Sequence, residues 1–531
     1  MADLSAVVRK SLAAACSETR EGVEADAIGG TAVTTAPGQA NAGKASPAAG
    51  GSGGTAVATA PGQAGEGEGR RGAVGGGGLV PAFVVAPGST DEAAAVLRVA
   101  AEQELAVVVR GAGSRLGWGV PPERCDLLID MSRMTGVVEH SAGDLVARIQ
   151  AGARMGDVAA VLARDGQEIA LDVPDRATIG GVVASGLAGP RRLRYGTPRD
   201  LLIGITIVRA DGTVARSGGK VVKNVAGYDL GKLLAGSAGT LALITEATFR
   251  LHPLPAARAY VTAEYVATGV ACDAVAAAAN SPLTASAVEL SRPRPGGPIQ
   301  IGVLIEGSAD GVAARAMRMA DLLGPAETAL TPPPWWHGAP EADGGTLIRV
   351  SFWVSALPKV LDAIGAAARD TGVSPVINGS AGAGVLYLQL DGDVSRNTPS
   401  VLSPGTPEAP SGAGVARAGA AGARAAGMAG VAGADVAGAA GAAGVAGVAG
   451  TDVAGADGAI DIAGFVRAVR SGLAGERGGV VVLAAPGPVR AAIAGDGGMA
   501  GSVPALALMR AVKDQFDPGR RLAPGRFPEA M

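Results

Sequence analysis

The sequence predicts a mixed α+β fold, in which one compact α+β unit is followed by a second and two low-complexity segments interrupt the chain. Two observations predict this fold. Short apolar strands and helical segments alternate over about residues 80–255, and the pattern continues more weakly from 256 to about 505. Such alternation is typical of domains in which helices cover a sheet. Residues 21–79 and 397–458 hold few large side chains, so they lack the apolar surface that would offset the entropy of ordering.

Composition excludes several classes of protein. The 531 residues include 84 glycines and 33 prolines, and aromatic residues make up only 3%, so the cores must be built from Val, Leu, Ile and Ala. A net charge of −3 gives no basic footprint for nucleic acid. Cys16, Cys125 and Cys272 are far apart, which argues against a zinc or iron–sulfur site and suits a reducing compartment.

Neither targeting nor membrane insertion is predicted. The first ten residues lack a basic region followed by an apolar core, which a signal peptide would have. The uncharged run over 436–451 is shorter than the roughly 20 residues that a spanning helix needs. We therefore expect a cytoplasmic protein.

The low-complexity segments are interpreted as linkers, with partner-docking tails as the alternative. The first contains the near-duplicates TAVTTAPGQA and TAVATAPGQA, and the second contains repeated Val-Ala-Gly units. The predicted organisation is an N-terminal helix over 1–20, a linker over 21–79, a first domain over 80–255, the first part of a second domain over 256–396, an insertion over 397–458, the second part of that domain over 459–504, and a C-terminal segment over 505–531.

Within the first domain each element has a local signal. Residues 81–85, 106–110, 127–130, 145–151, 201–208 and 242–251 are apolar or alternating and predict strands. Ser89 and Glu92 form a capping-box pattern before a helix, and 155–164 predicts a helix that ends before Gly166. Ala210-Asp-Gly212 predicts a hairpin turn. In the second domain, strands are predicted over 259–266, 299–305, 347–354 and 479–484, with helices over 272–280, 310–323, 357–370 and, near the C-terminus, 505–515.

Three elements of the first domain suggest a ligand site. Arg110-Gly-Ala-Gly-Ser114 follows a strand, so its backbone N–H groups form a nest suited to phosphate oxygens, although a plain turn has the same pattern. Thr178 is placed to cap a short helix whose start would offer free N–H groups to a ligand. Gly180 and Gly181 would let a flat or anionic ligand approach closely, and the alternative is a small-residue helix packed on a sheet. The third element, 220–250, combines Lys220, Asn224 and Tyr228 with a glycine bend and a strand.

These motifs resemble a known family. Residues 109–119, 177–202, 220–250 and 516–526 are similar to the PCMH-type FAD-binding fold of the vanillyl-alcohol-oxidase family. Thr178-Ile-Gly-Gly181, Gly189-Pro190, Arg199-Asp200 and the string Val222-Lys-Asn-Val-Ala-Gly-Tyr-Asp-Leu230 resemble the small FAD-binding subunit (E subunit) of bacterial glycolate oxidases. The resemblance implies an FAD-binding domain of two α+β lobes, a C-terminal α+β cap domain with disordered insertions, and a C-terminal segment that returns to the FAD-binding domain.

The resemblance also implies the cofactor site. FAD is expected to be non-covalent, because the first glycine-rich turn has no His. The positions implied to bind it are Arg110, Gly111, Ala112, Gly113, Ser114, Pro174, Thr178, Ile179, Gly180, Gly181, Asp200, Tyr228 and Ile244.

The sequence offers no clear catalytic base and no metal site. His140, His252 and His337 are widely separated, with His252 interpreted as a strand-end residue and His337 as a loop residue. No histidine is paired in sequence with an orienting carboxylate. Arg349 is the strongest candidate for binding a substrate carboxylate, and a surface strand arginine is an equally open alternative.

The expected function is that of an FAD-binding subunit of a glycolate-oxidising complex, which converts a 2-hydroxy acid to the 2-oxo acid. The resemblance implies a larger FAD-containing oxidase subunit and an iron–sulfur subunit as partners, with the membrane reached only through them. Two alternatives stay open: a stand-alone FAD-linked oxidase of another hydroxy acid or alcohol, and a non-catalytic assembly subunit.

Overall fold

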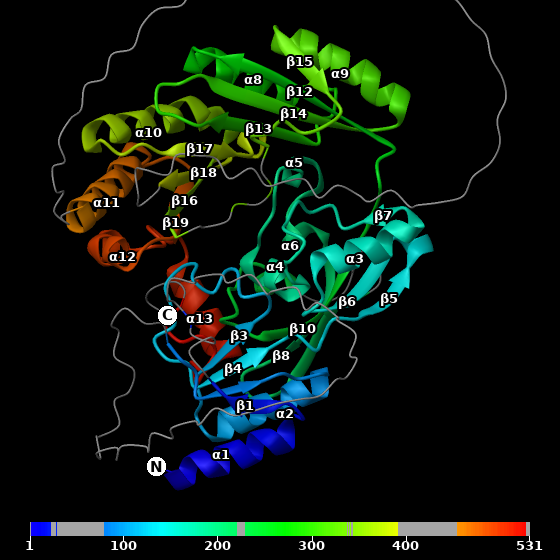
Figure 1. Cartoon of the computed structure of the whole chain (residues 1–531), viewed down its shortest axis with the longest axis vertical. Helices are drawn as coiled ribbons and strands as arrows, with labels where there is room; N and C mark the ends of the chain where they lie inside the picture. The colour runs from blue at the N-terminus through cyan, green and yellow to red at the C-terminus, as the bar shows by residue number, and fades with distance from the viewer. Residues whose placement is uncertain are drawn as a thin grey trace, which may run out of the picture.

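The computed structural model describes residues 2–22, 28, 79–219, 229–336, 338, 340, 344–390 and 454–526. Figure 1 shows two bodies, an eight-stranded sheet with its helices above and two smaller sheets with their helices below. The predicted α+β class, with two lobes and a cap, is confirmed.

The first lobe is a four-stranded sheet in the order β1-β2-β4-β3, with β2, β4 and β3 parallel and β1 antiparallel to β2. The apolar runs predicted as strands form this sheet. Thr19–Glu21, which the sequence places at the boundary between a helix and a linker, instead pairs with Phe83–Val85. The elements of the lobe are α1 (Ala2–Ala15), β1 (Thr19–Glu21), β2 (Phe83–Val85), α2 (Thr90–Glu102), β3 (Val107–Arg110) and β4 (Leu127–Asp130).

The second lobe is an antiparallel sheet in the order β5-β6-β10-β8-β9, and one apolar core joins it to the first lobe. A two-stranded ribbon, β7 with β11, lies beside it. The elements are β5 (Val137–Ser141), β6 (Val146–Gln150), α3 (Met155–Leu162), β7 (Gln167–Glu168), α4 (Ile179–Ser185), α5 (Arg192–Tyr195), α6 (Pro198–Leu201), β8 (Leu202–Val208), β9 (Val214–Gly218), α7 (Gly231–Leu234), β10 (Leu243–Arg250) and β11 (His252–Pro253).

The cap is a sheet in the order β15-β12-β14-β13-β17-β18-β16-β19, with a second apolar core between it and its helices. Strand β19 pairs with β16, so segments on either side of 391–453 meet in one sheet. The elements are β12 (Ala257–Tyr265), α8 (Thr268–Asn280), β13 (Ala287–Arg292), β14 (Ile299–Gly307), α9 (Ala309–Leu323), β15 (Ala326–Ala329), β16 (Thr346–Phe352), α10 (Leu357–Thr371), β17 (Val376–Gly379), β18 (Val385–Leu390), α11 (Ala454–Gly472), β19 (Gly478–Ala484) and α12 (Gly487–Ile493).

The alternation of side chains along the cap strands places one face on the helices and the other toward the lobes below. On β16, Ile348 and Val350 are buried in the core under the helices, so Arg349 points to the opposite face. The chain then ends on the first lobe with α13 (Leu506–Phe516), which lies near β3 in Figure 1.

Candidate functional site

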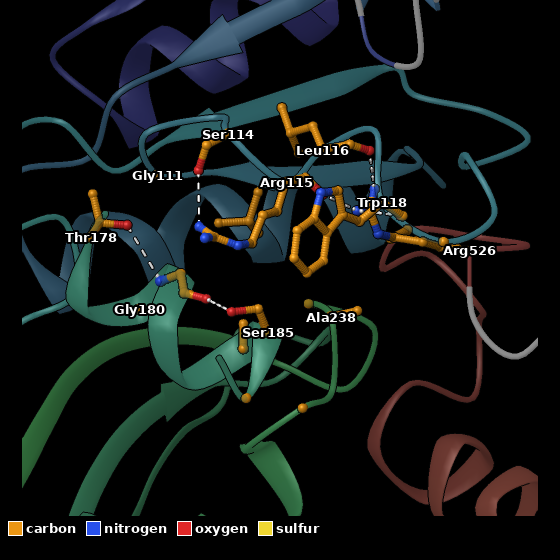
Figure 2. Close-up of a pocket in the computed structure, with 18 of the residues that line it drawn as sticks. Gly111, Ser114, Arg115, Leu116, Trp118, Thr178, Gly180, Ser185, Ala238 and Arg526 are labelled. Atoms are coloured by element: carbon orange, nitrogen blue, oxygen red, sulfur yellow. Dashed lines mark hydrogen bonds between the residues drawn. The ribbon is translucent and has the colours of Figure 1, made fainter. Parts of the chain in front are cut away.

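A cavity of about 510 Å³ lies where the two lobes meet the cap. Its walls come from the glycine-rich turn after β3, from α4, from the loop before β10, and from β16 and β19 of the cap. Figure 2 shows the side chains of Arg115 and Trp118 between the turn and α4. The three elements singled out in the sequence therefore do converge on one site.

The glycine-rich turn presents unused backbone donors. Within the described residues, the N–H groups of Gly111, Ala112, Gly113 and Ser114 donate to no other part of the chain, and all four residues line the cavity. Gly113 has a left-handed backbone (φ 78°), which favours glycine. The turn therefore has the free amides of an anion-binding nest.

Helix α4 lies against this turn, but its first amides are already occupied. A Cβ atom on Gly111 would lie 2.1 Å from Thr178 Oγ1, so the two elements are in direct contact. Thr178 caps the helix by accepting a hydrogen bond from Gly181 N at 3.3 Å. Ile179 N and Gly180 N donate to carbonyls at the end of β6, at 2.9 and 2.7 Å. The expectation of free N–H groups at this helix start is wrong, because the helix uses them to dock on the sheet.

The glycines of α4 also have a different role from the one expected. A Cβ on Gly180 would lie 2.8 Å from the Cβ of Ala151, and one on Gly181 would lie 2.9 Å from Thr178 Oγ1. Their small size permits packing within the protein, whereas the sequence suggested close approach by a ligand. Both residues nevertheless line the cavity.

The third element lies only partly within the described residues. Lys220, Asn224 and Tyr228 fall in 220–228, which the structure does not describe. The loop that follows has left-handed Gly236 and Gly239 (φ 88° and 76°) and is tied to α4 by two backbone hydrogen bonds, of 2.9 and 2.7 Å. Ile244 of β10 lines the cavity as well.

Four of the proposed cofactor residues do not line the cavity. Arg110 is held by an ion pair of 2.7 Å with Asp130 on the neighbouring strand. Ile179 is fully buried in the core, and Pro174 accepts a hydrogen bond from Ala177 N in the preceding loop. Asp200 accepts hydrogen bonds from the amide and hydroxyl of Thr197, at 2.7 and 2.8 Å, and so caps α6.

Two arginines contribute positive charge to the cavity. Arg349 reaches it from β16, and Arg526 reaches it from the C-terminal tail. Burial lowers the pKa of both guanidinium groups, to about 10 for Arg526, and the Nε atoms of both are buried without a hydrogen-bond partner. Arg349 is therefore not a surface strand residue. Arg526 was not among the residues predicted to bind the cofactor, although it lies in the segment 516–526 that resembles the family.

The histidines lie outside the lining of the cavity. His140 does have an orienting carboxylate, contrary to expectation: Nδ1 is 3.5 Å from Asp165 Oδ2, and Nε2 is 3.0 Å from Gln167 Oε1. His252 pairs within the β7–β11 ribbon and contacts Tyr195, with ring centroids 4.8 Å apart, as expected of a strand-end residue. Burial and then nearby arginines lower its pKa. His337 lies outside the described residues.

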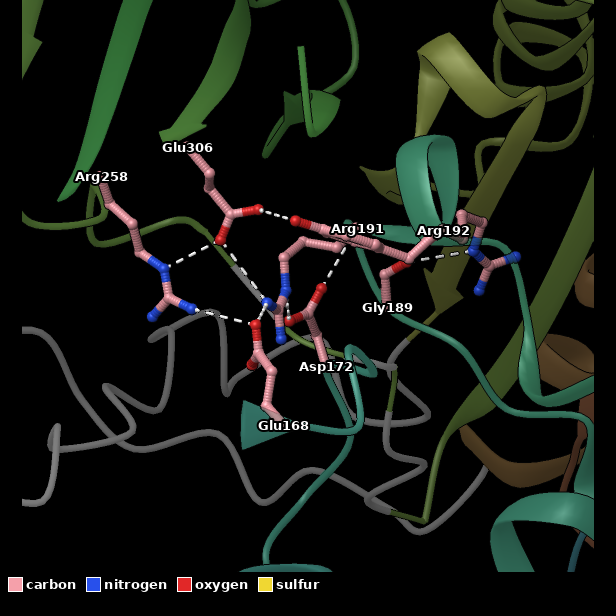
Figure 3. A network of polar contacts seen from close by, with 8 residues as sticks. Glu168, Asp172, Gly189, Arg191, Arg192, Arg258 and Glu306 are labelled. Atoms are coloured by element: carbon pink, nitrogen blue, oxygen red, sulfur yellow. Dashed lines mark hydrogen bonds and ion pairs between the residues drawn. The ribbon is translucent and has the colours of Figure 1, made fainter. Parts of the chain in front are cut away.

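Between the lobes and the cap lies a buried ionic network, shown in Figure 3. The Arg191 guanidinium is paired with Asp172 at 2.6 Å, with Glu168 at 2.7 Å and with Glu306 of the cap at 3.5 Å. Arg258 of the cap adds a bond of 2.9 Å to Glu306. The network therefore fixes one domain against the other beside the cavity.

Metal and thiol chemistry find no support in the described residues. No group of three or more His, Cys, Asp or Glu side chains is arranged to hold a metal ion there. All three cysteines are buried, and burial raises the pKa of each thiol, to about 12 for Cys125. In the part of the chain that the structure describes, no helix is both long and apolar enough to cross a membrane.

The geometry fits a dinucleotide that carries a pyrophosphate. Unused turn amides and the buried Arg526, which has no carboxylate partner among the described residues, are the kinds of donor that such an anion requires. Residues 81–218 match the family described as FAD binding domain. This part of the chain is similar to an FAD-binding domain, and FAD is the cofactor of the chain.

Several named proteins are similar in sequence to part of this chain. The chain is 36% identical over 188 residues to the glycolate oxidase subunit GlcD of Bacillus subtilis, which covers 35% of this chain and 40% of that protein. It is 38% identical over 154 residues to GlcE of Escherichia coli (28% and 43%), and 38% over 175 residues to D-lactate dehydrogenase of Archaeoglobus fulgidus (32% and 38%). The chain thus spans about two-fifths of the length of these relatives.

A solved structure of alkyldihydroxyacetonephosphate synthase superimposes with a TM-score of 0.53 at 15% identity. The match covers 84% of this chain and 76% of that one. This likeness confirms the fold and says nothing about the reaction.

Proposed function

We propose that the chain is an FAD-dependent oxidoreductase subunit that acts on the CH–OH group of a 2-hydroxy acid such as glycolate. The observation that carries this proposal is Arg349, a half-buried residue of the cap with a buried Nε atom, which lines the same cavity as the FAD-binding turn. Relatives named as glycolate oxidase subunits and D-lactate dehydrogenases support the substrate class.

Arg349 is suited to bind a substrate carboxylate. A guanidinium fork matches the two carboxylate oxygens, and the Nε of Arg349 has no hydrogen-bond partner among the residues that the structure describes. Tyr387 stands opposite Arg349 in the β16–β18 register, and its hydroxyl accepts a hydrogen bond of 3.0 Å from Arg192. The site thus supplies positive charge, and bound FAD would supply the electron-accepting chemistry.

The cavity offers no obvious proton acceptor. Among its described lining residues there is no His, Asp or Glu. This composition favours a subunit that works with others, and we propose the small FAD-binding subunit of a glycolate oxidase, with a larger FAD-containing oxidase subunit and an iron–sulfur subunit as partners. The 38% identity to GlcE supports that subunit role.

Purifying the chain separates the proposal from its alternatives. A yellow protein that glycolate bleaches under anaerobic conditions indicates a stand-alone oxidase. Bleaching only after the partners are added indicates the proposed subunit, and a colourless protein that still assembles with them indicates a scaffold. Acid precipitation should release the flavin into the supernatant, because we expect FAD to be non-covalent.

Arg349→Gln provides the test at residue level. We expect the glycolate concentration for half-reduction of the flavin to rise at least tenfold, with Arg349→Lys retaining part of the affinity and the flavin content unchanged. Exposed Arg369 on α10 offers a matched control, and Arg369→Gln should behave as the wild type. Equal glycolate dependence in Arg349→Gln and wild type would remove Arg349 from the substrate site.

A further inference from the structure

The C-terminal tail is built into the wall of the cofactor cavity. We define the C-terminal strap as residues 506–526, which comprise α13 and the segment after it. The strap docks on β3 through two backbone hydrogen bonds of 2.8 Å, from Val107 N to Arg521 O and from Ala523 N to Val107 O. Leu522, between them, is fully buried in the core of the lobes.

At the end of the strap, Arg526 holds the chain that continues from the glycine-rich turn. The Arg526 guanidinium donates to the carbonyls of Arg115, Leu116 and Trp118, at 2.8, 3.0 and 3.2 Å. Figure 2 shows Arg526 beside Leu116 and Trp118. The Arg526 side chain has no carboxylate partner among the described residues and is only 6% exposed.

A buried arginine without a counter-ion is costly unless other groups stabilise its charge. The dipoles of the three carbonyl groups stabilise part of the charge of Arg526. The same residue lines the cavity that takes FAD, so an anionic cofactor adds the charge that the protein does not supply.

In the helix of the strap, Lys513 holds the loop on the other side of the cavity. Lys513 Nζ is paired with Asp517 at 2.6 Å and donates to Thr240 O at 2.6 Å and to Leu522 O at 3.1 Å, and both charged side chains are almost fully buried. Thr240 ends the loop with Gly236 and Gly239, which lines the cavity across from the glycine-rich turn.

We propose that the C-terminal strap is a cofactor-positioning device, in which Arg526 and Lys513 hold the two loops on either side of FAD and so couple docking of the strap to FAD binding. This inference rests on FAD binding alone and is independent of the substrate. Because such coupling is reciprocal, FAD must stabilise the docked strap by the same factor as the strap strengthens FAD binding.

The test measures FAD affinity in full-length apoprotein by flavin titration. We expect Arg526→Gln to raise the Kd for FAD at least tenfold, and Arg526→Lys, which keeps the charge but cannot reach three carbonyls, to give a smaller loss. The matched control is Arg520→Gln on the same strap, because Arg520 is exposed and pairs only with Asp514 at 2.8 Å. That variant should bind FAD as the wild type does.

A second measurement keeps the proposal testable if Arg526→Gln fails to fold. In the wild type, FAD should slow hydrogen exchange at the amide of Ala523, which bonds to β3, by more than it slows exchange at core amides of the cap. A merely structural strap would show only the general slowing that any bound ligand gives. Slowing at Ala523 that is no greater than at those core amides overturns the proposal, as does a folded Arg526→Gln variant whose FAD Kd stays within twofold of wild type. Failure of the wild type to bind any FAD would instead refute the cofactor assignment.

Discussion

At the scale of single residues, Glu289 on β13 is a buried carboxyl group with an unpartnered Oε1 atom. Burial raises its pKa to about 7, although a hydrogen bond from Ser380 and the charge of Arg192 oppose the shift. Between about pH 4.5 and 7 the native state therefore holds a proton that the unfolded state has lost. Stability contributed by this group is present below that window and is lost as pH rises through it.

Glutamine does not titrate, so the free energy of unfolding of Glu289→Gln relative to that of the wild type should rise from pH 5 to pH 8. We expect this rise to be up to about 3 kcal/mol. The measurement is urea unfolding of both proteins at the two pH values. Glu327→Gln, on exposed β15, is the matched control and should show no such change. A difference between Glu289→Gln and wild type that is the same at both pH values would contradict the shifted pKa.

The sequence motifs predicted several residues of the site, but for some of them the structure shows a different role from the predicted one. Gly111–Ser114, Thr178 and Ile244 do line the cavity. Local motifs predicted them because turn and cap chemistry is local in sequence. The roles of Arg349 and Arg526 depend on how distant segments pack. The resemblance therefore brought the segment 516–526 to the FAD-binding domain without identifying Arg526, and the role of Arg349 was left open.

At the scale of elements, the Arg191 network joins α5 and β7 of the lobes to β12 and β14 of the cap. Removing the central cation would leave Asp172 without its partner in this network and Glu168 and Glu306 with only the half-exposed Arg258. Breaking a buried ion pair in this way costs about 3–5 kcal/mol. We expect Arg191→Met to lower the free energy of unfolding by that amount, measured by urea unfolding.

The neighbouring Arg258→Met is the control for this prediction. Arg258 is 39% exposed, so water screens its bond to Glu306, and its loss should cost about 1 kcal/mol or less. Similar costs for the two variants would mean that the network does not depend on Arg191.

Most strands and helices of the lobes were predictable because their apolar periodicity is clear, as in β4 and β10. Strands β5, β13, β15, β17 and β18 and helices α11 and α12 were not predicted. Strand β17 (Val376–Gly379) is short and ends in Asn-Gly, so it carries little apolar signal, and its pairing with β13 and β18 is what fixes it in the sheet.

At the scale of the whole molecule, the cavity is assembled from segments about 400 residues apart. Trp118 follows the glycine-rich turn, Leu483 comes from the cap, and the two segments are joined by a hydrogen bond of 2.7 Å from Gly119 N to Leu483 O. The sequence identified the segments but not this closure, because closure depends on cap strands that pair over long separations.

The last prediction concerns the segment between β18 and α11. Residues 391–453 lie outside the described residues, and the low-complexity sequence over 397–458 holds few large side chains, which predicts a linker. We expect that replacing 397–450 with a flexible linker of about 20 residues leaves the FAD Kd within twofold of wild type. Closing a loop about half as long should stabilise the fold by about 0.7 kcal/mol. Flavin titration and thermal unfolding measure the two effects, and loss of flavin would show that this segment does more than connect β18 to α11.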